Sequence, residues 1–224
     1  MESKQISKLA GTLIFIGIIA GILSVTPAVE SENYLEIVYI NKTKVLIAAF
    51  FQFLLIPIYI GFSLLMYPLI NQSNRVLSIG FVGFRFMAGA FQLLGIILLP
   101  AFIFLSEKYS LGINSNLIFF ETVGEILKVF RDLINHLGVI VATGLGNLLF
   151  YSILYKEKNT PIWLSIWGLA GNVVIIVASF LILFQLIDVI SIEYIVMTIP
   201  LLLQEIVLAI WLIKYGLRYT KLLI

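Results

Sequence analysis

The stretch from Leu77 to Leu105 is long enough to cross a bilayer as a helix and carries one charged residue, Arg85. A membrane helix needs about 20 apolar residues to cross roughly 30 Å of hydrocarbon. Several other stretches of the 224-residue chain approach or exceed this length, and 61% of all residues are hydrophobic whereas 12% are charged. Alternating ten-residue strands, typical of membrane barrels, do not occur. The sequence therefore predicts an all-α, polytopic membrane protein.

We expect a single domain that contains a bundle of six transmembrane helices. The predicted spans are approximately residues 9–25, 45–70, 77–105, 136–155, 162–187 and 194–215. Gly17 and Gly21 have the four-residue spacing that lets membrane helices pack closely, and Gly138, Ala142 and Gly146 repeat this spacing in the fourth span.

Two segments between the spans have distinct patterns. Residues 29–44 are rich in Glu and Lys, which predicts a polar loop whose apolar residues, including Tyr34, Leu35 and Val38, rest on the membrane interface. Residues 117–135 repeat apolar side chains at helical spacing opposite Glu121, Glu125, Lys128 and Asp132. We expect this amphipathic helix to continue unbroken into the fourth span, with its first half lying on or projecting from the membrane.

The distribution of basic residues predicts the orientation. Six spans place both termini on one side, and that side holds eight Lys and Arg residues, including Arg218 and Lys221, against five opposite. Because cytoplasmic loops carry an excess of Lys and Arg, we expect both termini in the cytoplasm, with the protein in the cytoplasmic membrane of a prokaryote.

Arg85 and Glu205 are the only base and acid well inside the predicted spans. From the rise of the helix, Arg85 lies roughly 10 Å and Glu205 roughly 13 Å from the cytoplasmic surface. A direct pair is the least costly arrangement, because each group alone would be an uncompensated ion in hydrocarbon. Polar residues of other spans reach a similar depth or share a helix face with them: Tyr59, Ser63, Gln92, His136, Asn147 and Asn172.

Two interpretations of this polar layer remain open. The polar groups can be hydrogen-bonding glue between helices, each bond contributing about 0.6 kcal/mol, with Arg85 and Glu205 as a structural clamp. Alternatively they line a cavity that opens toward the cytoplasm and binds a small ligand or ion.

Most catalytic chemistries are not supported by the sequence. His136 is the only histidine, it stands near the membrane surface, and there is no cysteine, so a zinc site lacks ligands. Neither a GxSxG turn nor a phosphate-binding GxxxxGK[ST] loop occurs. We therefore expect a protein that is not an enzyme and uses no cofactor or metal, and the net charge of +2 gives no reason to expect nucleic acid as a partner.

Short motifs in chain order cover nearly the whole sequence. They are Lys8-Leu9-Ala10-Gly11 and Ile18-Ile19-Ala20-Gly21-Ile22; Phe84-Arg85-Phe86 with Gln92; His136-Leu137-Gly138 and Gly144; Pro161-Ile162-Trp163-Leu164 with Gly168-Leu169-Ala170-Gly171; and Glu205 with Leu208-Ala209-Ile210-Trp211-Leu212 and Lys214. Together they resemble a family of bacterial and archaeal multi-pass membrane proteins, domain of unknown function 4386. The resemblance implies the six-span fold, brings no established activity, and singles out Arg85, His136 and Glu205. The charged stretch before His136 departs from the pattern.

The sequence thus favours a module in the lipid bilayer that binds or transports a small ligand or lipid. The alternative is a structural subunit that binds a protein partner through the helix at 117–135.

Overall fold

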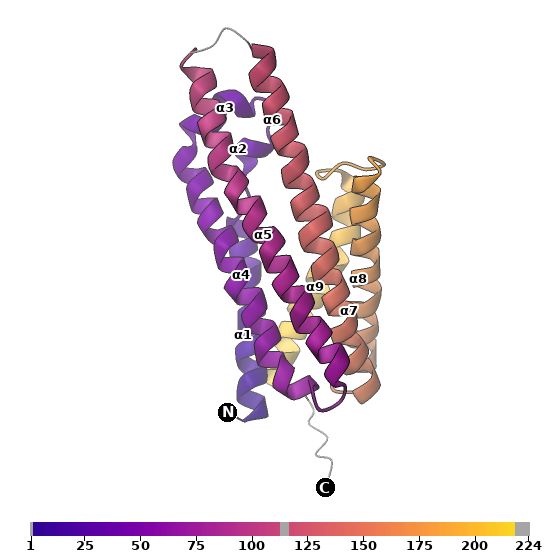
Figure 1. Ribbon diagram of the computed structural model, residues 1–224. Helices are drawn as coiled ribbons and strands as arrows, with labels where there is room; N and C mark the ends of the chain where they lie inside the picture. Colours follow the sequence, from indigo (N-terminus) through magenta and orange to yellow (C-terminus); the bar gives the residue numbers. More distant parts are fainter. Residues whose placement is uncertain (1, 113–116, 218–224) are drawn as a thin grey trace.

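The computed structural model describes residues 2–112 and 117–217, and the regular elements in these ranges are all helical (Figure 1). Arg218 and Lys221, which contribute to the predicted orientation, lie outside the described residues. The elements are α1 (Ser3–Leu23), α2 (Pro27–Glu30), α3 (Tyr34–Ile40), α4 (Lys42–Ile70), α5 (Arg75–Ser110), α6 (Leu117–Asp132), the π-helix η1 (Leu133–Val139), α7 (Ile140–Glu157), α8 (Ile162–Leu183) and α9 (Ile192–Lys214).

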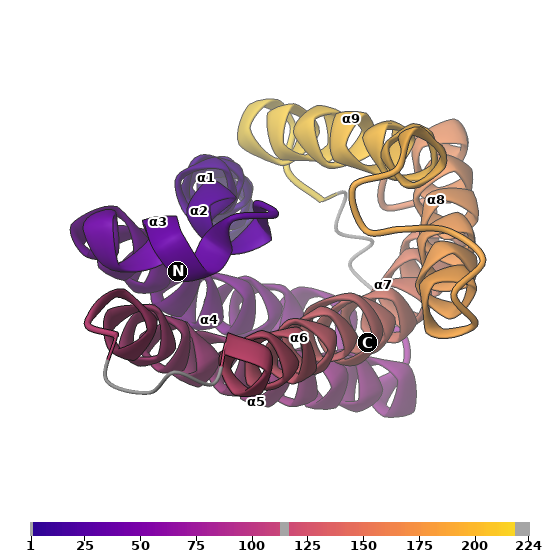
Figure 2. The same cartoon turned by 90° about the horizontal axis from the view of Figure 1, so that it is seen from above.

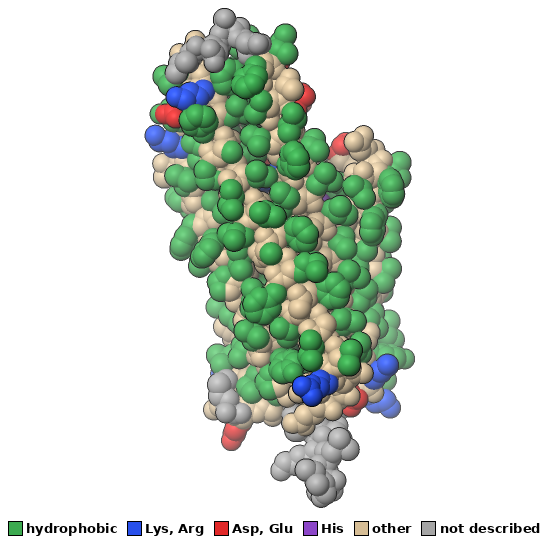
Figure 3. Space-filling view, viewed as in Figure 1, with side chains coloured by type: hydrophobic (Ala, Val, Ile, Leu, Met, Phe, Trp, Pro, Cys, Tyr) green, Lys and Arg blue, Asp and Glu red, His purple; other side chains and the backbone are tan. Residues whose placement is uncertain are grey.

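Six helices in the described ranges are long and apolar enough to cross a membrane, which confirms the all-α, polytopic fold. The predicted amphipathic helix and the fourth span form one 41-residue helix, Leu117–Glu157, made of α6, η1 and α7. In the space-filling view hydrophobic side chains cover the middle of the molecule, whereas Lys, Arg, Asp and Glu gather near its two ends (Figure 3). This distribution fits a multi-pass protein in a lipid bilayer.

The membrane helices form a closed ring in chain order (Figure 2). Each long helix packs against the next one along the chain, and α9 returns to pack against α1. The backbone amide of Leu217, just past α9, donates to Ser7 Oγ at 3.2 Å and brings the two ends of the described chain together. We call this the terminal end of the ring, and the opposite end, which carries α2, α3 and α6, the distal end.

At the distal end, residues 29–44 differ from the prediction. Instead of resting on the membrane interface, Tyr34, Leu35 and Val38 are buried in α3, in one cluster with Phe102 of α5 and Phe120 of α6. The reason is that α5 and α6 extend beyond the other helices and offer an apolar surface of their own (Figure 1). Burial there removes more apolar area from water than an interfacial loop would.

The small residues of the fourth span pack as predicted. A Cβ added at Gly138 would lie 2.7 Å from the Phe91 ring, and one at Gly146 would lie 3.0 Å from Phe84 Cβ, so both η1 and α7 lie close against α5. In α1 the prediction holds for Gly17, which packs on α4. It is wrong for Gly21, where an added Cβ would meet nothing within 4 Å.

The terminal half of the ring is filled by an aromatic plug. Phe81 of α5 and Phe150 of α7 stack with ring centroids 4.9 Å apart, and Phe62 of α4 packs edge-on against both. Met66, Leu154 and Leu212, all fully buried, extend this cluster toward the terminal end. The plug closes the ring at that end and forms the floor of the site described next.

Candidate functional site

Three adjoining cavities follow the axis of the ring from the plug to the distal end. The deep cavity has a volume of about 30 Å³, the middle cavity about 210 Å³ and the outer cavity about 700 Å³. Tyr59, Arg85, Asn147 and Glu205 line both the deep and the middle cavity. The middle cavity shares Gln92 and an apolar wall with the outer one: Leu55, Val139 and Ile140.

The outer cavity opens at the distal end, between the end of α1 and the start of α9. Its rim contains Val25 and Ile190, whose exposed fractions are 60% and 65%. The sequence predicted a cavity that opens toward the cytoplasm; in the structure the aromatic plug fills the ring at the terminal end, and the outer cavity opens at the opposite end.

Arg85 is the best-anchored charge in the ring. Its side chain is 5% exposed, and Nη2 donates to Asn147 Oδ1 at 2.6 Å. Asn147 Nδ2 donates in turn to Asn172 Oδ1 at 3.0 Å, and Asn172 Nδ2 donates to the backbone oxygen of Gly168 at 2.7 Å. This relay joins α5, α7 and α8 and holds the guanidinium at the cavity wall.

Aromatic rings complete the surroundings of Arg85. The guanidinium carbon lies 5.5 Å from the ring centroid of Tyr59 and 5.6 Å from those of Phe62 and Phe81. At this range the negative face of a ring attracts a cation. The Nε atom of Arg85 remains buried without a hydrogen-bond partner.

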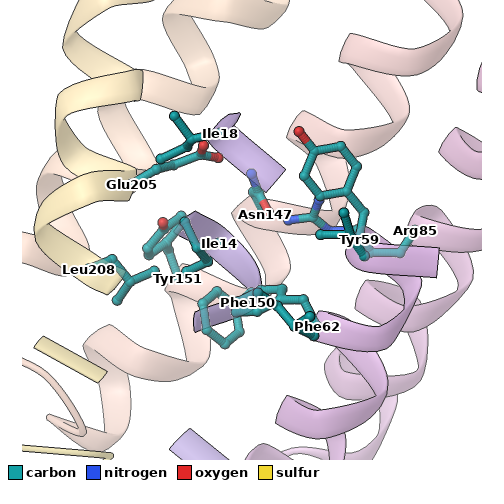
Figure 4. A pocket seen from close by; sticks show the side chains of 12 residues that line it. Ile14, Ile18, Tyr59, Phe62, Arg85, Asn147, Phe150, Tyr151, Glu205 and Leu208 are labelled. Atoms are coloured by element: carbon teal, nitrogen blue, oxygen red, sulfur yellow. Dashed lines mark hydrogen bonds between the residues drawn. The ribbon is translucent and has the colours of Figure 1, made fainter. Parts of the chain in front are cut away.

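The expected direct pair between Arg85 and Glu205 is not formed. Within the described ranges the single ion pair closer than 4 Å joins Arg131 and Glu30, and no hydrogen bond reaches the Glu205 carboxylate. Figure 4 shows Glu205 on the α9 side beside Ile18, with Asn147 between it and Arg85. The two charges are level but face each other across the cavities, because α5 packs against α4 and α7 whereas α9 packs against α8 and α1.

This arrangement predicts a small effect for the substitution Glu205→Gln. The free energy of unfolding, measured by denaturant titration in mixed micelles, should change by less than about 1 kcal/mol because no hydrogen bond of the carboxylate is lost. A loss of about 3–5 kcal/mol would instead be the signature of a broken buried ion pair and would contradict the observed separation.

The remaining predicted residues divide between the cavities and the helix core. Tyr59, Asn172 and Gln92 line the middle cavity. His136 lines the outer cavity, where its Nδ1 lies 2.8 Å from the Tyr194 hydroxyl. Ser63 stands apart: it is fully buried, and its hydroxyl donates back to the Ile60 carbonyl at 2.7 Å within α4. Ser63 therefore lines none of the three cavities.

Comparison with known proteins identifies the family of this chain. Residues 9–216 match the model of a family described as a domain of unknown function, DUF4386. The chain belongs to this family. No curated protein and no solved structure matches it. The DUF4386 match covers nearly the whole chain, so the ring of helices and the three cavities both lie inside the family's domain.

Sequence reasoning missed several polar residues of the DUF4386 ring. The Tyr151 hydroxyl donates to Gln204 Oε1 at 2.8 Å, which joins α7 to α9 below the cavity. Gln204 is fully buried beside Glu205 in an otherwise apolar run, and that position in the sequence was the available signal. The sequence did place Thr143 on the helix face of His136 and Asn147, and this residue lines the middle cavity.

Arg131, at the rim of the outer cavity, is a further overlooked residue. Its guanidinium pairs with Glu30 and donates to Thr26 Oγ1 at 2.9 Å. One turn earlier, Lys128 Nζ donates to the Ser31 carbonyl at 2.9 Å. These contacts tie α6 of the DUF4386 protein to the segment around α2. Their sequence separation of about one hundred residues left no local signal.

The π-helix η1 sits beside this rim. It spans Leu133–Val139 and carries Asn135 and His136, both of which line the outer cavity. The Asn135 Oδ1 atom is buried without a partner. Single-turn π-helical segments often mark functional positions because they change the direction of the side chains. Here η1 lies where the membrane helix α7 continues into the projecting α6.

Proposed function

We propose that this DUF4386 protein is a non-enzymatic membrane protein that binds, or moves, a small ligand or lipid in the cavities of its helical ring. The observation that carries the proposal is that, in the part of the chain that the structure describes, Glu205 and Arg85 both have hydrogen-bonding groups without a partner at the cavities. Glu205 borders two cavities and accepts no hydrogen bond from any described residue, and Arg85 faces the same cavities with Nε unpaired. Groups that serve only as glue between helices would be expected to satisfy each other.

Size and lining support the same proposal. An outer cavity of about 700 Å³ lies within the roughly 300–1,000 Å³ typical of small-molecule sites. Its walls combine apolar side chains with a few polar groups, including Gln52 and His136. We further propose that the termini are cytoplasmic, so that the mouth of the outer cavity faces away from the cytoplasm.

Cysteine labelling tests the proposal cleanly because the chain has no cysteine of its own. In intact cells, a small membrane-impermeant thiol reagent should label Thr143→Cys, whose side chain lines the middle cavity. Ser73→Cys, in the turn at the terminal end, should be labelled only after the cells are permeabilised. Val177→Cys is the control, because Val177 is 46% exposed on α8 but lines none of the cavities and should face lipid throughout.

If the thiol reagent labels Thr143→Cys no faster than Val177→Cys, water does not reach the middle cavity. That result would contradict a ligand site. That outcome would favour the second candidate, a structural subunit that binds a partner through residues 117–135. Its support is the apolar surface of α6, where Ile118 and Val129 have exposed fractions of 74% and 58%.

A further inference from the structure

The packing between α1 and α9 differs between the two halves of the ring. At the terminal half the two helices are in tight contact: a Cβ added at Gly11 would lie 2.7 Å from the backbone oxygen of Ala209. Farther along the same face of α1, at helical spacing, stand Ile18 and Ile22, and Val25 follows just after the end of the helix. Ile18 lines the deep cavity, whereas Ile22 and Val25 are 69% and 60% exposed.

The facing side of α9 shows the same change. Ala209 is fully buried, Glu205 borders the cavities, and Leu202 and Ile195 are each 44% exposed. The outer cavity lies between the two helices there, since Val25 and Ile195 both line it. Seen from the distal end, α1 and α9 stand apart (Figure 2). We call this gap, bounded by Ile22, Val25, Ile195 and Leu202, the α1–α9 opening.

The α1–α9 opening leads sideways rather than only to the distal surface. Ile22 and Leu202 lie in helices long and apolar enough to cross a membrane. In a bilayer their exposed side chains therefore meet acyl chains and not water. Glu205 stands where the opening closes, so a molecule that enters between α1 and α9 reaches this carboxylate and, across the cavity, Arg85.

The two charges define the chemistry of a fitting ligand. No residue in the ranges 2–112 and 117–217 donates a hydrogen bond to the Glu205 carboxylate, which therefore suits a positively charged N–H donor, while Arg85 suits an oxyanion. A simple anion would be repelled by Glu205, and a simple cation by Arg85. A zwitterion with a primary ammonium group and a phosphate or carboxylate satisfies both.

We propose, on the basis of the proposed function above, that the ligand is a zwitterionic amphiphile from the membrane. Its ammonium group contacts Glu205, its oxyanion contacts Arg85, and its acyl chain leaves through the α1–α9 opening. The apolar wall of the middle cavity, formed by Leu55, Ile175 and Leu201, suits the part of the molecule between headgroup and opening.

Binding of three matched probes to the full chain in a neutral maltoside detergent tests the headgroup and the chain. The probes are lysophosphatidylethanolamine, lysophosphatidic acid without the amine, and phosphoethanolamine without the chain. Measured by thermal shift and native mass spectrometry, the first should bind at least about tenfold more tightly than either of the others, since a charge-assisted hydrogen bond contributes about one order of magnitude. The substitution Glu205→Gln should remove most of the preference for the amine.

A second pair of variants tests the route. Ile22→Trp combined with Leu202→Trp, two positions that bound the α1–α9 opening but line none of the three cavities, should fill the opening and weaken binding of lysophosphatidylethanolamine at least about tenfold. The control combines Ile166→Trp with Val173→Trp on α8, where exposed fractions of 49% and 50% are similar but neither residue lines a cavity. This control should bind as the unmodified protein does. Labelling of Thr143→Cys should persist in both, which shows that the distal mouth stays open.

Three outcomes would overturn the inference without touching the proposed function. Equal affinity for phosphoethanolamine, with no effect of the tryptophans at the opening, would identify a water-soluble zwitterion. Absence of binding by all three probes, while Thr143→Cys is still labelled, would leave a hydrated site for another ligand class. A change in oligomeric mass in place of a change in binding would show that a second copy of the chain covers the α1–α9 opening.

Discussion

The substitution Asn147→Leu is expected to destabilise the protein by about 1.5–3 kcal/mol, the contribution of a hydrogen bond to a buried charged group. Asn147 Oδ1 accepts the hydrogen bond from Arg85 Nη2, and Arg85 Nε already lacks a partner. Without Asn147 the guanidinium would keep its positive charge, because it cannot lose a proton to escape. The free energy of unfolding by denaturant titration in mixed micelles measures the effect.

The double variant Arg85→Leu with Asn147→Leu is the decisive comparison. Replacing both members of a buried polar contact by apolar groups of similar size is often close to neutral, so most of the lost stability should return. Ser63→Ala serves as a control of small effect, because that hydroxyl bonds only to its own helix. Additive losses in the double variant would show that Asn147 does not carry the charge of Arg85.

The substitution Gly11→Ala is expected to destabilise the protein by about 1–3 kcal/mol, at the upper end of that range. The added methyl group would lie 2.7 Å from the backbone oxygen of Ala209 and 2.8 Å from Ile213 Cγ1. A backbone atom cannot rotate away, so α1 and α9 must separate and the ring loses its closing contact. Thermal unfolding in detergent should record a clear fall in Tm.

Gly21→Ala is the matched control in the same helix. No atom lies within 4 Å of the added methyl group, and alanine favours the helix over glycine by about 0.5–1 kcal/mol. Its Tm should be unchanged or slightly raised. Equal destabilisation by both substitutions would mean that α1 packs against α9 along its whole length, which would also remove the α1–α9 opening.

The sequence predicted the spans and the depth of the charges because both depend on position along the chain alone. The length of each apolar run determines where a helix can cross a membrane, and the rise per residue then gives the depth of Arg85 and Glu205. The same reasoning put Asn147 and Asn172 at that level, and the structure joins them in one relay.

Partners across the bundle could not be derived in this way. Arg85 and Glu205 are level, yet α5 and α9 stand on different sides of a ring, and Asn147 of the neighbouring α7 receives the hydrogen bond. Ser63 lies one turn from Tyr59 in α4. Its hydroxyl donates to the Ile60 carbonyl of the same helix and does not line the cavity. Such outcomes depend on how far each helix is rotated about its axis, which no local pattern specifies for helices apolar on every side.

The sequence by itself determined an all-α, six-span architecture, the unbroken helix from 117 to 157 and the level of the polar layer. Only the tertiary structure decided that Asn147 holds Arg85, that Glu205 borders the deep and middle cavities, and that the outer cavity adjoining them opens at the distal end. The physical reason is that the length of an apolar run is a local property of the sequence. The ring, its plug and its opening instead arise from contacts between residues far apart in the chain. Gly11 against Ala209 and Arg131 against Glu30 are such contacts.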